Sequence, residues 1–529
     1  MSIPGNSGKK YQPAVILLSL SLLTLLIHFF TNAVTGFGIF RDEFYYLACS
    51  RRLTAGYVDQ PPLSIFLLAL SRMVFGDSLF AIRIFPALSG AFSVFLTGLI
   101  VQRLGGGKFA VVLASICYIA APVFLAMNNI YSMNAFDILL WTAAFYILIL
   151  LFEENASPQK KTTGYWIWLG IILGLGLLNK ISILWFGTGL FLALLTRQYR
   201  HFLKTPGPYT AALIAFLLFI PFVIWNIEHG LAHLEFMENA SGIKYRSVTP
   251  LDLLSGQILL MLPFSLPVWI AGVYYFFSDK KGKTFRAIGI IYLATIAILV
   301  VNWHSKPEYA APAYPVLFAG GSILIEKFLS KKHLRRLSYA FSVIIAVGGI
   351  LLSPFCLPFL PVKTFVGYSR MTGIQPGGNE GKKLSSLPQI YADMFGWENM
   401  ARTVSEVYLA LPEGERRSAF VFAQNYGEAS ALEYYGKKYP LPKVVCPHNS
   451  FWLWQWEELK NRPNLSNYRT VIIIGGRKED HMRVLEKVEQ KGFIKSEFAM
   501  PYENNLPVYV GNSFRLPLKT IWESEKRFI

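Results

Sequence analysis

The chain has 529 residues, of which 53% are hydrophobic and 16% are charged, and its mean hydropathy is +0.40. Soluble domains carry about a quarter charged residues, so this composition excludes an ordinary soluble protein and predicts an integral membrane protein. The net charge of +18 comes largely from short basic clusters between apolar runs, a pattern that favours membrane topology signals over a nucleic-acid partner. The four cysteines have neither paired nor metal-ligand spacing.

The first apolar run follows Lys9-Lys10 as in a signal peptide, but it is too long and lacks a small-residue cleavage site, so we expect a retained helix. Two shorter runs between residues 165 and 196 flank Asn179-Lys180. Together the runs predict about eleven transmembrane helices. The other runs lie near residues 13–31, 84–101, 109–126, 132–152, 209–226, 255–277, 286–301, 308–325 and 337–355.

With the N-terminus in the cytoplasm, every basic cluster between these runs falls on the cytoplasmic side, as the positive-inside rule requires. We therefore expect residues 1–357 to form an all-α, multi-pass bundle in the cell (inner, cytoplasmic) membrane. Leu63–Phe75 is apolar but short, and Pro61-Pro62 opens it, so it is predicted to lie at the interface rather than to span. One large extracytoplasmic loop, residues 32–82, then holds two juxtamembrane helices, Phe44–Arg52 and Pro62–Phe75.

From residue 358 the apolar runs shorten to strand length, and helical patterns alternate with them. An odd number of spans would place this part outside the cytoplasm, so residues 358–529 are predicted to form an extracytoplasmic soluble α/β domain. The expected strands are Ala419–Ala423, Lys443–Cys446, Val471–Ile474 and Val508–Val510, and the expected helices are Trp397–Leu411, Gly427–Lys437 and Lys478–Lys491.

Several short motifs fall on the predicted outer face. They are Arg41-Asp42-Glu43-Phe44-Tyr45-Tyr46, Asp59-Gln60-Pro61-Pro62-Leu63, Arg83-x-x-Pro86, Met133-Asn134-Ala135-Phe136-Asp137, Leu178-Asn179-Lys180, Lys306-Pro307-Glu308-Tyr309-x-x-Pro312-x-Tyr314-Pro315 and Asn425-Tyr426-Gly427-Glu428-Ala429. In this order the motifs resemble the bacterial branch of the protein O-mannosyltransferase superfamily (glycosyltransferase family 39). These are the C-type membrane glycosyltransferases that include lipid A aminoarabinose transferase.

The resemblance implies an inverting transfer of one sugar from a polyprenyl-phosphate-linked donor to an extracytoplasmic acceptor. It assigns Asp42 as the general base, since an inverting displacement needs a carboxylate that takes the acceptor's hydroxyl proton. Glu43 would orient Asp42 or bind the acceptor or a metal. Alternatively, both acids cap a juxtamembrane helix, whose N-terminus favours anions.

The leaving phosphate needs cations or a metal to neutralise its charge. Gln60 stands where the aminoarabinose-transferase branch has a lysine near the donor phosphate, so other residues are candidates to hold it: Lys306, Tyr309, Arg83, Arg51 and Arg52. The arginines would alternatively be interfacial anchors, and Tyr309 an interfacial aromatic.

Asp59 matches an acidic position that approaches a divalent cation in some relatives, which makes it the candidate ligand of a possible metal cofactor. Asp137 lies one turn inside a helix, where a charge is costly unless it faces a polar cavity. The residues predicted to line the site are Asp59, Gln60, Asn134, Asp137, Lys180 and Glu308.

The expected partners are the polyprenyl-phosphate-linked donor, membrane lipids and an acceptor, with no nucleic acid. A lipid, a glycan and a protein fit equally well as acceptor. The main alternative is a multi-pass transporter or flippase of a lipid-linked or anionic substrate, which would show inverted repeats and ionisable residues near the membrane midplane. A catalytically inactive scaffold is a third reading. Polar residues that gather at one face favour an enzyme.

Overall fold

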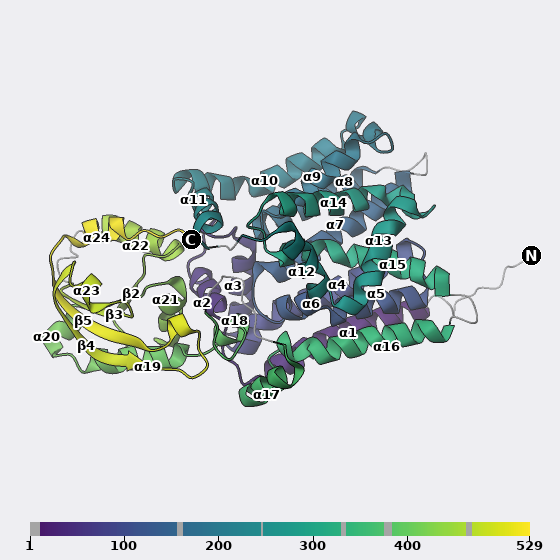
Figure 1. The fold of residues 1–529 in the computed structure, drawn as a ribbon. Coiled ribbons are helices and arrows are strands. Elements are labelled where there is room, and N and C mark those ends of the chain that lie inside the picture. Colours follow the sequence, from purple (N-terminus) through teal and green to yellow (C-terminus); the bar gives the residue numbers. More distant parts are fainter. Residues whose placement is uncertain (1–10, 156–161, 245–246, 330–334, 375–382, 462–467) are drawn as a thin grey trace, which may run out of the picture. The chain divides into compact units, whose positions relative to one another are not determined.

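The computed structural model (Figure 1) describes residues 11–155, 162–244, 247–329, 335–374, 383–461 and 468–529. The chain divides into two compact units. Unit 1 comprises Met1–Thr35, Val74–Ile224 and Ser247–Phe359; unit 2 comprises Gly36–Met73, Trp225–Arg246 and Leu360–Ile529. Most of the predicted loop 32–82 therefore groups with the predicted C-terminal domain, so the division is discontinuous in sequence, unlike the predicted split at residue 357.

Unit 1 is built of helices, and each predicted apolar run coincides with one or two of them. Short 3₁₀ turns join several of the helices, among them Pro307–Ala313. The helices are α1 (Tyr11–Val34), α4 (Leu79–Arg103), α5 (Lys108–Ala120), α6 (Pro122–Met127), α7 (Met133–Asn155), α8 (Thr163–Asn179), α9 (Ile183–Leu195), α10 (Gly207–Glu228, which ends in unit 2), α12 (Pro250–Leu260), α13 (Leu266–Ser278), α14 (Arg286–Val301), α15 (Tyr314–Leu329) and α16 (Arg335–Leu352).

In the part of the chain that the structure describes, six helices are long and apolar enough to cross a membrane, judged by length and composition, or seven if one bent pair counts as a span. This is fewer than the eleven predicted, because several apolar helices have only 10–17 residues. The run 255–277 is not one straight helix, since α12 and the segment that holds α13 meet at 92°. Pro263 lies at the break and Leu262 has a left-handed φ of 69°, which ends α12 there.

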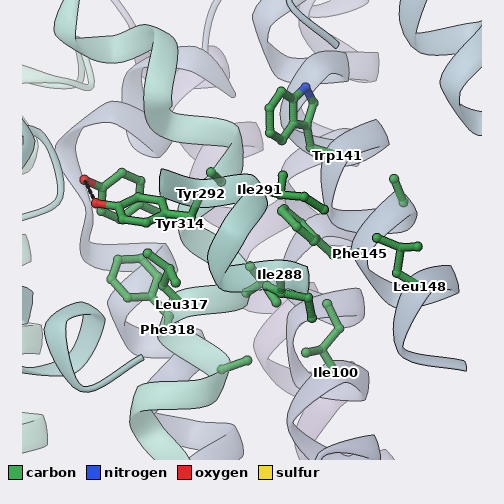
Figure 2. Packing of buried hydrophobic residues seen from close by; sticks show 14 of the residues in the cluster. Ile100, Trp141, Phe145, Leu148, Ile288, Ile291, Tyr292, Tyr314, Leu317 and Phe318 are labelled. Atoms are coloured by element: carbon green, nitrogen blue, oxygen red, sulfur yellow. Dashed lines mark hydrogen bonds between the residues drawn. The ribbon is translucent and has the colours of Figure 1, made fainter. Parts of the chain in front are cut away.

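Large apolar side chains from α4, α7, α14 and α15 form the core of unit 1 (Figure 2). Trp141 and Phe145 of α7 lie near Ile291 of α14, while the hydroxyls of Tyr292 and Tyr314 lie 3.3 Å apart. Helices α13 and α15 come especially close. A Cβ at Gly321 would lie 1.7 Å from the Val268 carbonyl oxygen, so only glycine permits this approach.

Unit 2 combines short helices with one sheet. The two predicted juxtamembrane helices are present as α2 and α3. The helices are α2 (Arg41–Ser50), α3 (Leu63–Phe75), α11 (Ala232–Asn239), α17 (Val362–Thr372), α18 (Gln389–Ala392), α19 (Trp397–Leu409), α20 (Glu413–Arg417), α21 (Tyr426–Tyr435), α22 (Ser450–Asn461), α23 (Lys478–His481) and α24 (Leu518–Ser524). The strands are β1 (Ala419–Phe422), β2 (Lys443–Val445), β3 (Thr470–Ile474), β4 (Leu485–Ile494) and β5 (Leu506–Phe514).

The five strands form one mixed sheet in the order β2-β1-β3-β5-β4, with α22 and α24 on one side and α19 on the other (Figure 1). Strands β2, β1 and β3 run parallel, while β5 is antiparallel to both β3 and β4. The four predicted strands are confirmed. The predicted helix Lys478–Lys491 is wrong beyond its first turn, because Leu485–Ile494 pairs with β5 as an edge strand, and this pairing overrides local helix propensity.

Candidate functional site

The carboxylate of Asp42 lies in the first turn of α2, and its side chain is 38% exposed. The Tyr426 hydroxyl donates a hydrogen bond to Asp42 Oδ1 over 2.9 Å, and Arg41 Nε approaches the same oxygen at 3.3 Å. Within the described residues, every polar contact of Asp42 is made by Oδ1. The second oxygen, Oδ2, is therefore left to accept a proton from an incoming group.

Arg41 connects Asp42 to residues far along the chain. It donates to the Tyr502 hydroxyl over 2.6 Å, and it forms an ion pair with Asp393 at 3.8 Å. Tyr502 in turn donates to Asp393 Oδ1 over 3.1 Å. A Cβ at Gly427 would lie 2.6 Å from Arg41 Cγ, so glycine at the start of α21 makes room for the arginine stem.

Glu43 has a different environment from Asp42. Its side chain is fully buried, and its Oε2 accepts a hydrogen bond from the Phe40 amide over 2.9 Å, which satisfies a backbone donor at the start of α2. The two acids of the motif are thus held in different ways. Glu43 fixes the helical turn that presents Asp42.

Asp59 is held by Tyr45 of α2, which also contacts α22. Tyr45 donates to Asp59 Oδ1 over 2.9 Å and accepts from the Ser450 amide over 3.2 Å. Burial and the negative charge of Asp59 raise the pKa of the Tyr45 phenol well above its usual range, so it stays a donor. Gln60 is buried, and within the described residues its Nε2 has no hydrogen-bond partner.

The metal expected at Asp59 stays a prediction. Among the residues that the structure describes, no group of three or more His, Cys, Asp or Glu side chains is placed to hold a metal ion. One oxygen of Asp59 is already bound to Tyr45. A stable divalent site needs several oxygen ligands, so a metal at Asp59 would take further ligands from the substrate or from water.

Arg51 and Arg52 anchor the end of α2 to α21. Arg52 makes a forked pair with the Glu433 carboxylate, at 2.9 and 2.6 Å, and its guanidinium lies 4.6 Å from the centre of the Trp454 ring. Arg51 donates to the Glu433 carbonyl over 3.4 Å. In this structure both side chains contact protein groups.

A buried pair of carboxyl groups lies at the start of α21. Asn425 Nδ2 donates to Glu428 Oε1 over 3.0 Å and to Glu503 Oε1 over 2.9 Å. Burial, together with the proximity of the two groups, raises the pKa of the Glu428 carboxyl well above its ordinary value. Burial raises the pKa of Glu503 to about 7, although the charge of Arg41 opposes this. Helix α21, which carries Tyr426, therefore begins beside two buried carboxyl groups that bind protons more readily than exposed ones.

A second cluster lies in unit 1, around Lys180 between α8 and α9. Lys180 Nζ donates to Asn134 Oδ1 over 2.8 Å, lies 3.7 Å from Asp137 Oδ2 and stands 4.7 Å from the centre of the Tyr309 ring. Ser182 donates to the same Asp137 oxygen over 3.1 Å. The charges of two further candidates in this unit, Glu308 and Lys306, also act on Lys180. The structure thus joins four of the sequence candidates directly.

Arg83 is fully buried in α4, and its guanidinium lies 3.4 Å from Asn32 Oδ1 of α1. This contact lies within the packing of α1 against α4.

Sequence reasoning missed most of the residues that hold Asp42 and its neighbour Arg41. Tyr426 lies in a motif that was noted without a role, and Arg41 lies beside the acid itself. Asp393 and Tyr502 are 351 and 460 positions from Asp42, as their places in the sequence show, and neither lies in a recognisable motif. Only the folded structure brings them together.

Residues 59–225 match the family model described as dolichyl-phosphate-mannose-protein mannosyltransferase. An undecaprenyl phosphate-alpha-4-amino-4-deoxy-L-arabinose arabinosyl transferase of Pseudomonas fluorescens is 27% identical over 124 residues, or 23% of this chain and 21% of that protein. An uncharacterised protein of Aquifex aeolicus is 23% identical over 339 residues, or 59% of this chain and 63% of that protein. The chain thus matches about a fifth of the length of the first relative and less than two thirds of the second.

Two solved structures share the fold over most of the chain. ArnT of Cupriavidus metallidurans, bound to undecaprenyl phosphate, superposes with a TM-score of 0.60 at 13% identity and covers 94% of this chain and 97% of its own. The archaeal oligosaccharyltransferase AglB of Archaeoglobus fulgidus, in complex with an inhibitory peptide and a dolichol phosphate, has a TM-score of 0.53 at 12% identity, over 88% and 69% of the two chains. The chain therefore has the fold of the C-type membrane glycosyltransferases, and its sequence is similar to their protein O-mannosyltransferase-like and aminoarabinose transferase-like branch.

Proposed function

We propose that this protein is an inverting glycosyltransferase of the cell inner membrane, which moves one sugar from a polyprenyl-phosphate-linked donor to an acceptor outside the cytoplasm. The similarity to transferases that use undecaprenyl phosphate-linked aminoarabinose supports the donor class. The shared fold with a structure that holds undecaprenyl phosphate supports it as well. The acceptor is a lipid, a glycan or a protein exposed on the same side of the membrane as Asp42.

The observation that carries the proposal is the environment of Asp42. Its carboxylate is partly exposed, two donors hold Oδ1, and Oδ2 makes no contact with the described residues. In the proposed step Oδ2 takes the proton of an acceptor hydroxyl while the hydroxyl oxygen bonds to the anomeric carbon. The bond from that carbon to the phosphate oxygen breaks, and polyprenyl phosphate leaves with the bonding electron pair. Configuration inverts because attack and departure occur on opposite faces.

Several cations in the chain suit the departing phosphate, whose negative charge grows as the bond breaks. We assign this role to Lys306 with Tyr309, and to Lys180 as the charged centre of the unit 1 cluster. Lys180 lies 3.7 Å from Asp137 Oδ2, so in this proposal its charge is shared between that carboxylate and the phosphate. Arg83, Arg51 and Arg52 contact protein groups in this structure and act in the proposal as supports of the site.

The remaining acids support Asp42 in this proposal. Glu43 caps α2 and so fixes the direction of the catalytic carboxylate. Asp59 and Gln60 line the acceptor side, where Tyr45 holds Asp59 in place. We further propose that the N-terminus is cytoplasmic and that unit 2 lies outside the cytoplasm, in accord with the placement of the basic clusters.

Mass spectrometry of envelope lipids and glycans from cells with and without the protein tests the proposal. The wild type should add one sugar to a defined acceptor, and Asp42→Asn should abolish this product while the protein still inserts. Loss of a general base lowers turnover about 10²–10⁴-fold. Asp480→Asn is the matched control, because this exposed carboxylate is paired with Arg477. Equal product from Asp42→Asn would refute the assignment and favour a transporter or flippase.

A further inference from the structure

A cavity of about 670 Å³ lies in unit 2, between the sheet and helices α22 and α24. Protein interiors are normally close-packed, with few voids larger than a water molecule. Pockets that bind small molecules have volumes of roughly 300–1,000 Å³. Neither Asp42 nor any side chain that contacts it lines this cavity, so it is a separate feature of the molecule.

The central wall of the cavity is apolar and elongated. Phe420 and Phe422 of β1 and Val471 and Ile473 of β3 line it, while the alternate residues of these parallel strands do not. The lining continues from Phe420 of β1 to Gln424, two residues past the end of the strand. At about 3.3 Å per residue this stretch is roughly 13 Å long.

The charged residues around this wall are paired with one another inside the chain. The pairs are Lys443 with Glu458, Arg477 with Asp480, and Arg527 with Glu525. Arg417 is paired with Glu413, which does not itself line the cavity. Gln455 donates to the Val444 carbonyl over 3.0 Å and accepts from the Cys446 amide over 2.9 Å. Trp522 Nε1, which also lines the cavity, has no hydrogen-bond partner within the described residues. The charged groups named here and Gln455 are already engaged, so a sugar or nucleotide would have to compete for them, whereas an apolar chain needs no such partners.

We propose that this cavity binds the acyl chain of an amphiphile, with the chain along β1 and β3. Two sources share this chemistry: a free fatty acid, and the acyl chain of a membrane or acceptor lipid. The inference rests on the shape and chemistry of the wall and is independent of glycosyl transfer.

Photo-crosslinking of the full-length protein in lipid nanodiscs tests the proposal. One arm uses palmitic acid that carries a diazirine on its chain, and the other uses a phosphatidylethanolamine that carries the same chain. After illumination, mass spectrometry should find adducts on the peptides that contain Phe420–Phe422, Val471–Ile473 and Leu518–Trp522. Unlabelled palmitate should compete, and a soluble monosaccharide should not. Adducts in the first arm alone identify a free fatty acid, and adducts in the second identify a lipid.

Variants separate binding from folding. Ile473→Trp fills the cavity from the sheet, and Leu518→Trp fills it from α24; each should lower the cavity adducts at least tenfold. Ile472→Val is the control, since Ile472 is buried but does not line the cavity. Adducts on the transmembrane helices should stay unchanged in all three variants. The proposal is overturned if neither arm labels these peptides, or if both filling variants that unfold like the wild type keep their adducts.

Discussion

Tyr426→Phe isolates the contact that orients the proposed base. The substitution removes the hydroxyl that donates to Asp42 Oδ1 over 2.9 Å and keeps the ring. The ring packs 4.9 Å from that of Tyr45 and 4.8 Å from that of His448, between ring centres, so the local packing should persist. Any effect therefore reports on the hydroxyl.

The magnitude follows from the kind of hydrogen bond that is lost. A hydrogen bond to a charged group contributes about 1.5–3 kcal/mol, and each 1.36 kcal/mol of barrier is tenfold in rate. If the bond acts fully in the transition state, kcat should fall about 10- to 150-fold.

The assay measures initial rates in proteoliposomes with the donor and acceptor that envelope mass spectrometry identifies. Tyr435→Phe is the matched control, since it makes the same change on the same helix but its residue packs against Phe44 rather than Asp42. A rate for Tyr426→Phe within twofold of the control would refute the reasoning.

Two further predictions concern stability. Between about pH 4.5 and 7 the folded protein binds more protons at Glu503 than the unfolded chain does. This group therefore lowers the free energy of unfolding progressively as the pH rises through that range. In Glu503→Gln the thermal unfolding midpoint should fall less over the same range. Lys180→Met leaves the buried Asp137 carboxylate without its cation and should destabilise the protein by about 3–5 kcal/mol. The double variant Lys180→Met with Asp137→Leu should lose clearly less stability than Lys180→Met alone in the same melting assay. A steeper decline for Glu503→Gln, or a double variant as unstable as the single one, would contradict these expectations.

Long apolar runs and turn residues were sufficient to predict most helices of unit 1, as well as α2 and α3 in unit 2. They were not sufficient to predict where an apolar run breaks. Residues 255–277 read as one span, yet Leu262 adopts a left-handed conformation before Pro263 and the helices bend by 92°. Because the residues on both sides of the proline are apolar, the hydropathy of this segment does not reveal the break.

Strand β4 shows a different limit. Its segment Glu486–Lys491 carries residues that favour helices, and only the antiparallel pairing of Lys487 and Glu489 with β5 makes it a strand. The partner strand β5 lies about twenty residues further along the chain, so the local propensity of the segment cannot predict the pairing.

The candidate site likewise contains residues that the sequence could predict and residues that it could not. Motif resemblance drew attention to Asp42, Lys180 and Asn134, because those residues occur in short recognisable stretches. It could not predict that Asp393 and Tyr502 would hold Arg41, since a contact across hundreds of positions leaves no spacing pattern. The buried cap made by Glu43 was anticipated only as one of two readings of the acid pair.

The hydrogen bond between Asp42 and Tyr426 joins residues 384 positions apart, and it has a consequence for biosynthesis. At translation rates of about 5–20 residues per second, the ribosome needs roughly 20–75 seconds to reach Tyr426 after it has added Asp42. During that interval a nascent chain already carries the acid but not the side chain that orients it. A polypeptide that terminates before Tyr426 is thus expected not to transfer sugar, although it already contains the residues proposed to hold the donor phosphate.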